Sequence, residues 1–141
     1  RSTLDRSSAA SDVYKRQNVF WNLEHADKAY EEAYRVLKKD GILILEDGNY
    51  YRRFFSDKYQ KAYDEFQRGH EKEEQGCHAR HNKENVDFSI MDEIAKKLPM
   101  SQVDRPAWDF NKLVETGFHK IQVEIAGSPL PMSFCIVAQK G

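Results

Sequence analysis

The side chains best suited to chemistry follow one apolar run. Residues 42–45 read Ile-Leu-Ile-Leu, and Glu46, Asp47, Gly48 and Asn49 come directly after them. In open parallel sheets, ligands bind at the carboxyl ends of the strands. A polar segment with a glycine, placed directly after a buried strand, is therefore a candidate binding site. The alternative is a solvated turn in front of a helix.

His25 is a second residue with useful chemistry, because an imidazole exchanges protons near neutral pH. It precedes a predicted helix and would act as a base if a substrate lay beside it. A lone histidine in such a position more often caps the helix or lies at the surface. The sequence contains no recognisable set of nucleophile, base and orienting residue, and no phosphate-binding loop.

Cys77, His78 and His81 form a third group, with His70 and Glu71 upstream. The pattern C-H-x-x-H supplies metal ligands at close spacing. No second cluster exists to complete a tetrahedral site, and the stretch reads as an exposed loop between helices. The favoured interpretation is a polar loop, and no metal site is predicted.

A helix that begins near Asp27 is the first element needed to position these residues. Its apolar stripe recurs at spacings of three and four, which is typical of a half-buried helix. The members of the stripe are Ala29, Tyr30, Ala33, Tyr34 and Leu37.

The end of this helix is predicted from two lysines and a glycine. Lys38 and Lys39 would lie in the last turn, where cations complement the helix dipole. Gly41 would supply the left-handed position that terminates the helix. Residues 42–46 then form a strand that is apolar on both faces, so we expect helices to cover it on both sides.

The rest of the chain alternates helical and extended patterns. Aromatic residues at helical spacing predict a long amphipathic helix over residues 50–75. A short helix begins at Ser89 and stops at Pro99, and Asp109 caps another helix that ends at Gly117. Strands are expected at residues 118–125 and 133–139, separated by a turn.

Composition excludes several classes of protein. The net charge is −1 with 32% charged residues, so we expect no nucleic-acid partner and no anionic membrane surface as a partner. No apolar run approaches the roughly 20 residues of a membrane span. Two cysteines far apart form no disulfide framework, which favours a reducing compartment. The sequence therefore predicts a cytoplasmic protein.

The segment R-V-L-K-K-D-G-I-L-I-L-E-D at residues 35–47 resembles a known motif. It is similar to the Arg-Val-Leu-Lys-Pro-Gly-Gly turn and following strand of class I S-adenosylmethionine-dependent methyltransferases, with Lys39-Asp40-Gly41 in place of Pro-Gly-Gly. N-V-F-W-N-L-E-H at residues 18–25 resembles the loop after that family's fourth strand. D-F-N-K-L-V-E-T-G-F-H-K-I-Q-V-E at residues 109–124 resembles its last helix and sixth strand.

The resemblance implies an α/β fold, namely the C-terminal half of a Rossmann-like methyltransferase sheet, strands four or five to seven, with flanking helices. It implies that residues 118–125 and 133–139 pair antiparallel, with the last strand between the other two.

It also implies roles for individual residues. Asn18 and Val19 would touch the cofactor, and Trp21, Asn22, Asn49 and Tyr50 would face the substrate. His25 or Asp47 would serve as the base where the nucleophile must lose a proton. The alternative is that the residues at 18–23 only seal a helix against the sheet.

The family's glycine-rich cofactor loop has no counterpart in these 141 residues. Residues 18–141 are therefore expected to be the C-terminal half of a methyltransferase domain. Residues 1–17 are polar and aperiodic and resemble a translated sequencing-adapter tail. We expect them to be non-native or disordered, although residues 12–17 would stand where the family's fourth strand ends.

Two functions follow. The first is a methyltransferase that acts on a small molecule with S-adenosylmethionine as cofactor in the intact parent, this chain being an inactive fragment of it. In methyl transfer the sulfonium carries the hard chemistry, so no catalytic triad is required. The second is a non-catalytic α/β binding or interaction module, which the missing glycine-rich loop favours for this polypeptide.

Overall fold

A computed structural model describes residues 11–77, 89–126, 130 and 132–141, with the backbone alone at residues 66 and 69–77. The strands are β1 (Ser11–Gln17), β2 (Leu37–Gly48), β3 (Phe118–Ala126) and β4 (Ser133–Lys140). The α-helices are α1 (Ala26–Val36), α2 (Asp57–Cys77), α3 (Ser89–Ala95) and α4 (Ala107–Thr116). Short 3-10 turns span Phe20–Asn22, Arg52–Phe54 and Pro99–Ser101.

The four strands form one mixed sheet in the order β1-β2-β4-β3. β1 runs parallel to β2, whereas β4 runs antiparallel to both β2 and β3. The prediction that residues 42–46 form a central strand is confirmed, because β2 has a paired neighbour on each side. The prediction that residues 133–139 insert between the other strands is confirmed as well.

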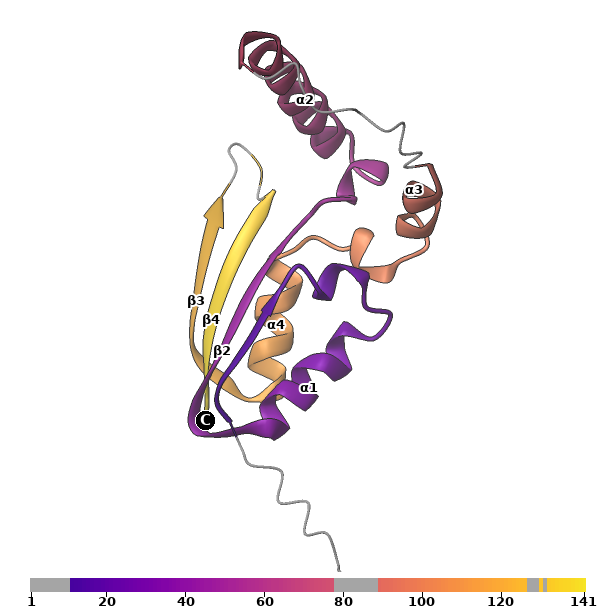
Figure 1. Ribbon diagram of the computed structural model, residues 1–141. Helices are drawn as coiled ribbons and strands as arrows, with labels where there is room; N and C mark the ends of the chain where they lie inside the picture. Colours follow the sequence, from indigo (N-terminus) through magenta and orange to yellow (C-terminus); the bar gives the residue numbers. More distant parts are fainter. Residues whose placement is uncertain (1–10, 78–88, 127–129, 131) are drawn as a thin grey trace, which may run out of the picture.

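Helices α1 and α4 lie side by side on one face of the sheet (Figure 1). The predicted stripe of α1 faces this layer, with Tyr30 and Ala33 fully buried against Leu43 and Leu45 of β2. Alternation along the strands puts Ile42 and Ile44 on the opposite face. Within the described part of the chain no helix covers that face, and Ile42 is 37% exposed. The expectation of cover on both faces is therefore wrong for the described residues.

The junction between α1 and β2 differs from the prediction. The helix ends at Val36, and β2 already begins at Leu37, so Lys38 and Lys39 belong to the strand. Asp40, with φ 62°, takes the left-handed position expected at Gly41. A Cβ at Gly41 would lie 2.9 Å from the Lys38 carbonyl and 3.2 Å from that of Ser11. Gly41 is thus explained by the close approach of two backbone carbonyls, first that of Lys38 in the same strand and then that of Ser11 in β1, not by a helix cap.

Residues 11–17 form strand β1, so the expectation of a wholly disordered segment at residues 1–17 is wrong for this part; residues 1–10 lie outside the described residues. β1 is held chiefly by its backbone ladder with β2. Tyr14 packs against the core, whereas Val13 is 52% exposed. A strand with so few buried side chains leaves a weak apolar signal in the sequence. Whether the segment is native stays a prediction.

The region predicted as one helix over residues 50–75 begins differently. Residues 52–54 form a 3-10 turn, and α2 starts only at Asp57. Asp109 is also not a cap, because α4 begins at Ala107 and the Asp109 side chain is fully buried. Its carboxylate has one charged partner in the interior, Arg105, which a capping pattern does not reveal.

Candidate functional site

The carboxyl ends of β1 and β2 lie side by side, which brings together two segments that are far apart in the sequence. Asn18 follows β1 with φ 52°, and its backbone N–H donates to the Glu46 carbonyl at 2.8 Å. Asparagine tolerates this left-handed conformation better than most residues do. The turn at Asn18 directs the chain away from the sheet and into the 3-10 turn that carries Trp21 and Asn22.

Asn18 also connects the two segments through its other polar groups. Its side-chain Oδ1 accepts a hydrogen bond from the Tyr50 hydroxyl at 2.7 Å, and its backbone carbonyl accepts one from Trp21 Nε1 at 3.0 Å. Three residues that the resemblance assigns to the site, Asn18, Trp21 and Tyr50, are therefore in mutual contact.

Trp21, Tyr50, Tyr51 and Phe54 form what we call the aromatic surface. Ring centroids lie 5.1 Å apart for Trp21 and Tyr51 and 6.1 Å apart for Tyr51 and Phe54, while the Tyr50 ring stands edge-on to Trp21 at 6.5 Å. All four side chains are partly exposed. Tyr50, Tyr51 and Phe54 follow β2 directly, in the segment that leads to α2, whose course Figure 1 shows.

A buried polar network lies beneath the aromatic surface. Arg105 donates to Asp47 Oδ2 through Nη1 at 3.0 Å and to Asp109 Oδ1 through Nη2 at 2.7 Å. The Tyr30 hydroxyl donates to Asp109 Oδ1 at 2.6 Å. Asp47 also accepts the backbone N–H of Trp21 at 3.0 Å and that of Gly48 at 2.9 Å. The network therefore joins α1, β2 and α4 to the backbone that carries Trp21.

The charges in this network stabilise one another. Burial on its own lowers the pKa of Arg105, but the hydrogen bonds and charge of Asp109, with the charge of Asp47, raise it overall. Burial, followed by the charge of Asp109, raises the pKa of the Tyr30 hydroxyl well above its usual value. Arg105 therefore stays charged and Tyr30 neutral at all ordinary pH values. The Asp47 carboxylate, which is 2% exposed and held by three donors, is poorly placed to take a proton from a substrate.

The remaining predicted site residues lie in different settings. Asn49 is buried, and its Nδ2 donates to the Arg105 carbonyl at 2.7 Å and to the Tyr59 hydroxyl at 3.3 Å, so it braces the loop and does not face a substrate. Val19 is half-buried, whereas Asn22 is exposed. His25 is exposed at the N-cap position of α1 and makes no side-chain cap.

Sequence reasoning missed Arg105 as a member of this region. Arg105 lies 58 residues from Asp47 and four residues before Asp109. The signal available in the sequence is an arginine and an aspartate at helical spacing next to a proline. That pattern is common on solvated helix faces, so burial of the pair becomes evident only from the fold.

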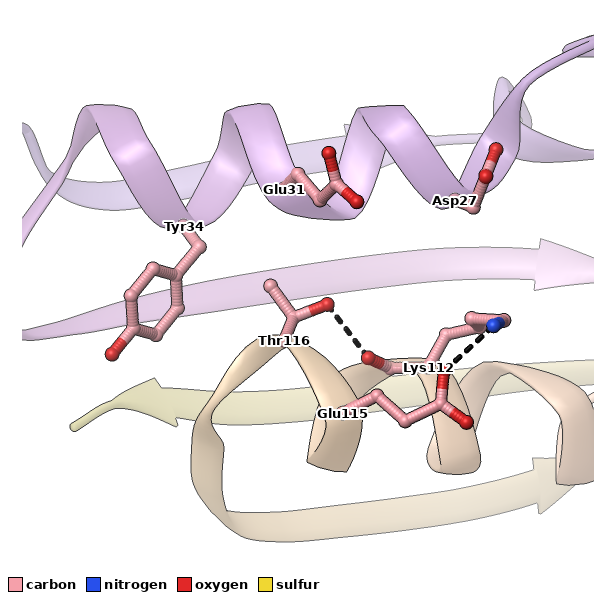
Figure 2. Close-up of a pocket in the computed structure, with 6 residues that line it drawn as sticks. All are labelled: Asp27, Glu31, Tyr34, Lys112, Glu115 and Thr116. Carbon is pink, nitrogen blue, oxygen red and sulfur yellow. Dashed lines mark hydrogen bonds and ion pairs between the residues drawn. The ribbon is translucent and has the colours of Figure 1, made fainter.

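A separate hollow of about 380 Å³ lies between α1 and α4. Figure 2 shows its lining side chains, which are Asp27, Glu31 and Tyr34 from α1 and Lys112, Glu115 and Thr116 from α4. The Lys112 ammonium pairs with the Glu115 carboxylate at 2.6 Å. The hydrogen bond to Glu115, together with the charges of nearby carboxylates, raises the pKa of Lys112. The hollow is open and strongly polar, and it is lined by none of the predicted site residues.

The described side chains contain no group of three or more histidine, cysteine, aspartate or glutamate residues able to hold a metal ion. The side chains of the Cys77, His78 and His81 group lie outside the described residues. Within the described part of the chain, no helix is long and apolar enough to span a membrane.

Comparison with known proteins finds similarity among solved structures. No protein-family model and no curated protein sequence matches the chain. Among solved structures, the chain is similar to a possible exported protein from Bordetella parapertussis, with a TM-score of 0.53 and 12% sequence identity. The match covers 94% of this chain and 39% of that one, so this chain spans less than half the length of the similar protein. At this identity the likeness supports an α/β fold with flanking helices.

The expectation of a cytoplasmic location is contradicted by this comparison. The similar protein is described as a possible exported protein, which points away from the cytoplasm. The expectation was based on two cysteines that lie far apart in the sequence, and a low cysteine count is compatible with either type of compartment.

Proposed function

We propose that this chain is the acceptor-binding part of a class I S-adenosylmethionine-dependent methyltransferase that acts on a small molecule. It is inactive without the remainder of that domain. The observation that carries the proposal is the strand order. The family resemblance implies that the last strand lies antiparallel between two other strands. In the order β1-β2-β4-β3, β4 lies antiparallel between β2 and β3, and β1 runs parallel to β2.

The position of the aromatic surface supports the same proposal. It lies at the carboxyl ends of the two parallel strands, where α/β sheets bind their ligands. The buried polar network fixes the Trp21 backbone from below, so the acceptor would meet a rigid wall. Positioning of this kind supplies much of the rate enhancement when the cofactor is itself the electrophile.

S-adenosylmethionine fits the described residues only in part. The resemblance assigns Asn18 and Val19 to one edge of the cofactor, but the Asn18 backbone N–H already donates to the Glu46 carbonyl and the Asn18 carbonyl already accepts from Trp21 Nε1. Asp47 and Asp109 are the buried carboxylates nearby, and both are already bonded to Arg105, so neither is free for ribose hydroxyls. The described residues therefore form one wall of a site and not a complete cofactor pocket.

A non-catalytic binding module is the second candidate. The burial of Asp47 favours it, because this candidate base, whose carboxylate accepts the Trp21 N–H, is paired with Arg105 in the interior.

Calorimetry with S-adenosylmethionine on two proteins tests the proposal. The first is the present chain, for which we expect no micromolar binding because each missing hydrogen-bonded anchor removes about 1–3 kcal/mol. The second is the longer protein encoded by the gene with its upstream sequence, for which we expect micromolar binding.

Two results would contradict the proposal. One is an upstream sequence without a glycine-rich loop, together with a longer protein that does not bind S-adenosylmethionine, and this result would favour the binding module. The other is a clear micromolar isotherm for the present chain, which would mean that the site is built differently from that of the family.

A further inference from the structure

The ligand class of the aromatic surface follows from the chemistry that surrounds it. We propose that the surface formed by Trp21, Tyr50, Tyr51 and Phe54 binds a neutral, flat aromatic molecule that carries a hydrogen-bond acceptor. This inference rests on the proposed function for the role of the ligand as methyl acceptor, but the binding itself needs no cofactor.

The first argument is the geometry of the rings. Trp21 meets Tyr51 at a tilt of 38°, and Tyr50 meets Trp21 at 86°, so the exposed part of Trp21 is flanked by a face on one side and an edge on the other. Tyr51 and Phe54 lie nearly parallel at 15° and continue the same surface. A planar ring adds to such a set by offset stacking or by edge-to-face contact, whereas an aliphatic chain gains only burial.

The second argument is charge. Each charged side chain that touches these rings or adjoins them is already held in an ion pair. Arg53 lies 4.5 Å from the Phe54 ring centroid and pairs with Asp92 at 3.0 Å. Arg52, next to Tyr51 in the sequence, pairs with Asp104 at 2.9 Å. Asp47 is paired with Arg105 as well, so none of these neighbouring charged groups is left over for an anionic or cationic ligand.

The third argument is the turn at Asn18. Its left-handed backbone holds the side chain beside Tyr50 and Trp21, and its Oδ1 is engaged by the Tyr50 hydroxyl. Strained backbone of this kind persists where neighbouring groups determine it, and it gathers at ligand sites. The Asn18 amide N–H groups have no acceptor among the described residues, so they are able to donate to an oxygen or nitrogen on the ligand.

The test is saturation-transfer NMR on the full 141-residue chain at low micromolar concentration, with 2-naphthol as the probe. We expect saturable binding of 2-naphthol. We expect binding at least about tenfold weaker for the saturated analogue decahydro-2-naphthol and for the anion 2-naphthoate. Equal binding of either analogue would overturn the assignment of an aromatic or a neutral ligand, respectively.

Variants locate the binding. Trp21→Ala should weaken 2-naphthol binding about tenfold, while Trp21→Phe, which keeps an aromatic ring, should restore most of it. Phe110→Ala removes an exposed aromatic residue on α4, away from this surface, and should leave the affinity unchanged. No saturable binding by the parent chain, or equal losses in Trp21→Ala and Phe110→Ala, would overturn the proposal. Circular dichroism of each variant confirms that its fold is intact.

The two proposals fail separately. If 2-naphthol binds at Trp21 but the longer protein takes up no S-adenosylmethionine, the aromatic site stands and the methyltransferase function is wrong. If the longer protein binds the cofactor but 2-naphthol does not bind the aromatic surface, the methyltransferase function stands and the ligand class is wrong.

Discussion

Arg105 holds its guanidinium in the interior, between the carboxylates of Asp47 and Asp109. Its side chain is 1% exposed, so the charge has been removed from water at a large cost in free energy. The hydrogen bonds offset that cost only while every partner stays in place. Because Asp47 also accepts the Trp21 N–H, the guanidinium stabilises the backbone beneath the aromatic surface.

Replacing Arg105 with methionine should lower the free energy of unfolding by about 3–5 kcal/mol, because two buried carboxylates would lose their counter-ion. Urea denaturation followed by circular dichroism measures the change. Arg35→Met is the matched control, since Arg35 forms a solvent-exposed pair with Glu32 and its loss should have no measurable effect. Equal urea midpoints for Arg105→Met and Arg35→Met would contradict the claim that the buried polar network stabilises the fold.

Tyr30 should make the protein sensitive to alkaline pH. Its folded-state pKa is raised by burial and by Asp109, so the unfolded chain releases this proton first as the pH rises. The stabilising effect is complete below about pH 10, the ordinary tyrosine pKa, and falls by about 1.4 kcal/mol per pH unit until the folded-state pKa is reached. Tyr30→Phe should flatten this part of the stability profile in urea titrations between neutral and alkaline pH. An unchanged slope would assign the effect to other groups.

At the scale of elements, the turn from α4 into β3 depends on one glycine. Gly117 has φ 106°, and its N–H caps α4 by donating to the carbonyls of Leu113 and Val114. The left-handed backbone costs a residue with a Cβ about 1–2 kcal/mol. A Cβ at this position would also lie 3.2 Å from the Tyr34 hydroxyl. The predicted C-terminal boundary of this helix is therefore correct for the physical reason given.

Gly117→Ala should lower the thermal midpoint by several degrees, because a loss of 1 kcal/mol shifts it by about 2–8 °C in domains of roughly this size. Gly117→Asn should lower the thermal midpoint less, since asparagine adopts the left-handed backbone conformation more readily than alanine does. Differential scanning calorimetry ranks the two variants. If Gly117→Ala and Gly117→Asn lower the thermal midpoint equally, the loss of stability would come from the contact with Tyr34 and not from the backbone conformation.

Short-range patterns predicted the elements whose signals are local. Tyr30 and Ala33 are buried as their spacing indicated, and the apolar run at residues 42–45 is a central strand. The predicted end of α1 was wrong because Leu37 is already extended, with φ −75° and ψ 144°, so the segment up to Gly41 belongs to β2. The site was predicted only in part. Asn18, Trp21 and Tyr50 come together, but the Arg105 partner of Asp47 depends on a contact across 58 residues, which no local pattern encodes.

At the scale of the whole molecule, the two faces of the sheet differ in how much of their apolar surface the described helices cover. α1 and α4 bury one face, while Val13 and Ile42 remain exposed on the other, beside the unpaired edge of β1. Apolar surface next to a free strand edge promotes association between copies of a protein.

We expect the isolated chain to associate as its concentration rises and to unfold with low cooperativity. Size-exclusion chromatography at increasing concentration and a thermal melt measure both properties. Ile42→Lys should delay association because it places a charge on the open face. Val114→Lys makes the same change on α4, where the side chain is 52% exposed, and should have little effect. A monodisperse monomer with a sharp transition at all concentrations would contradict the prediction and would favour residues 11–17 as a native strand.

The central place of β4 also has a consequence during synthesis. A ribosome releases the chain from its N-terminus, so β3 leaves the exit tunnel before the strand that joins it to β2. Until residues 133–140 have emerged, β2 has one paired edge and β3 has none. The β1–β2 pair can therefore form early, but β3 joins the sheet only when β4 pairs between it and β2. During that interval its open edges are the natural targets of the chaperones that attend translation.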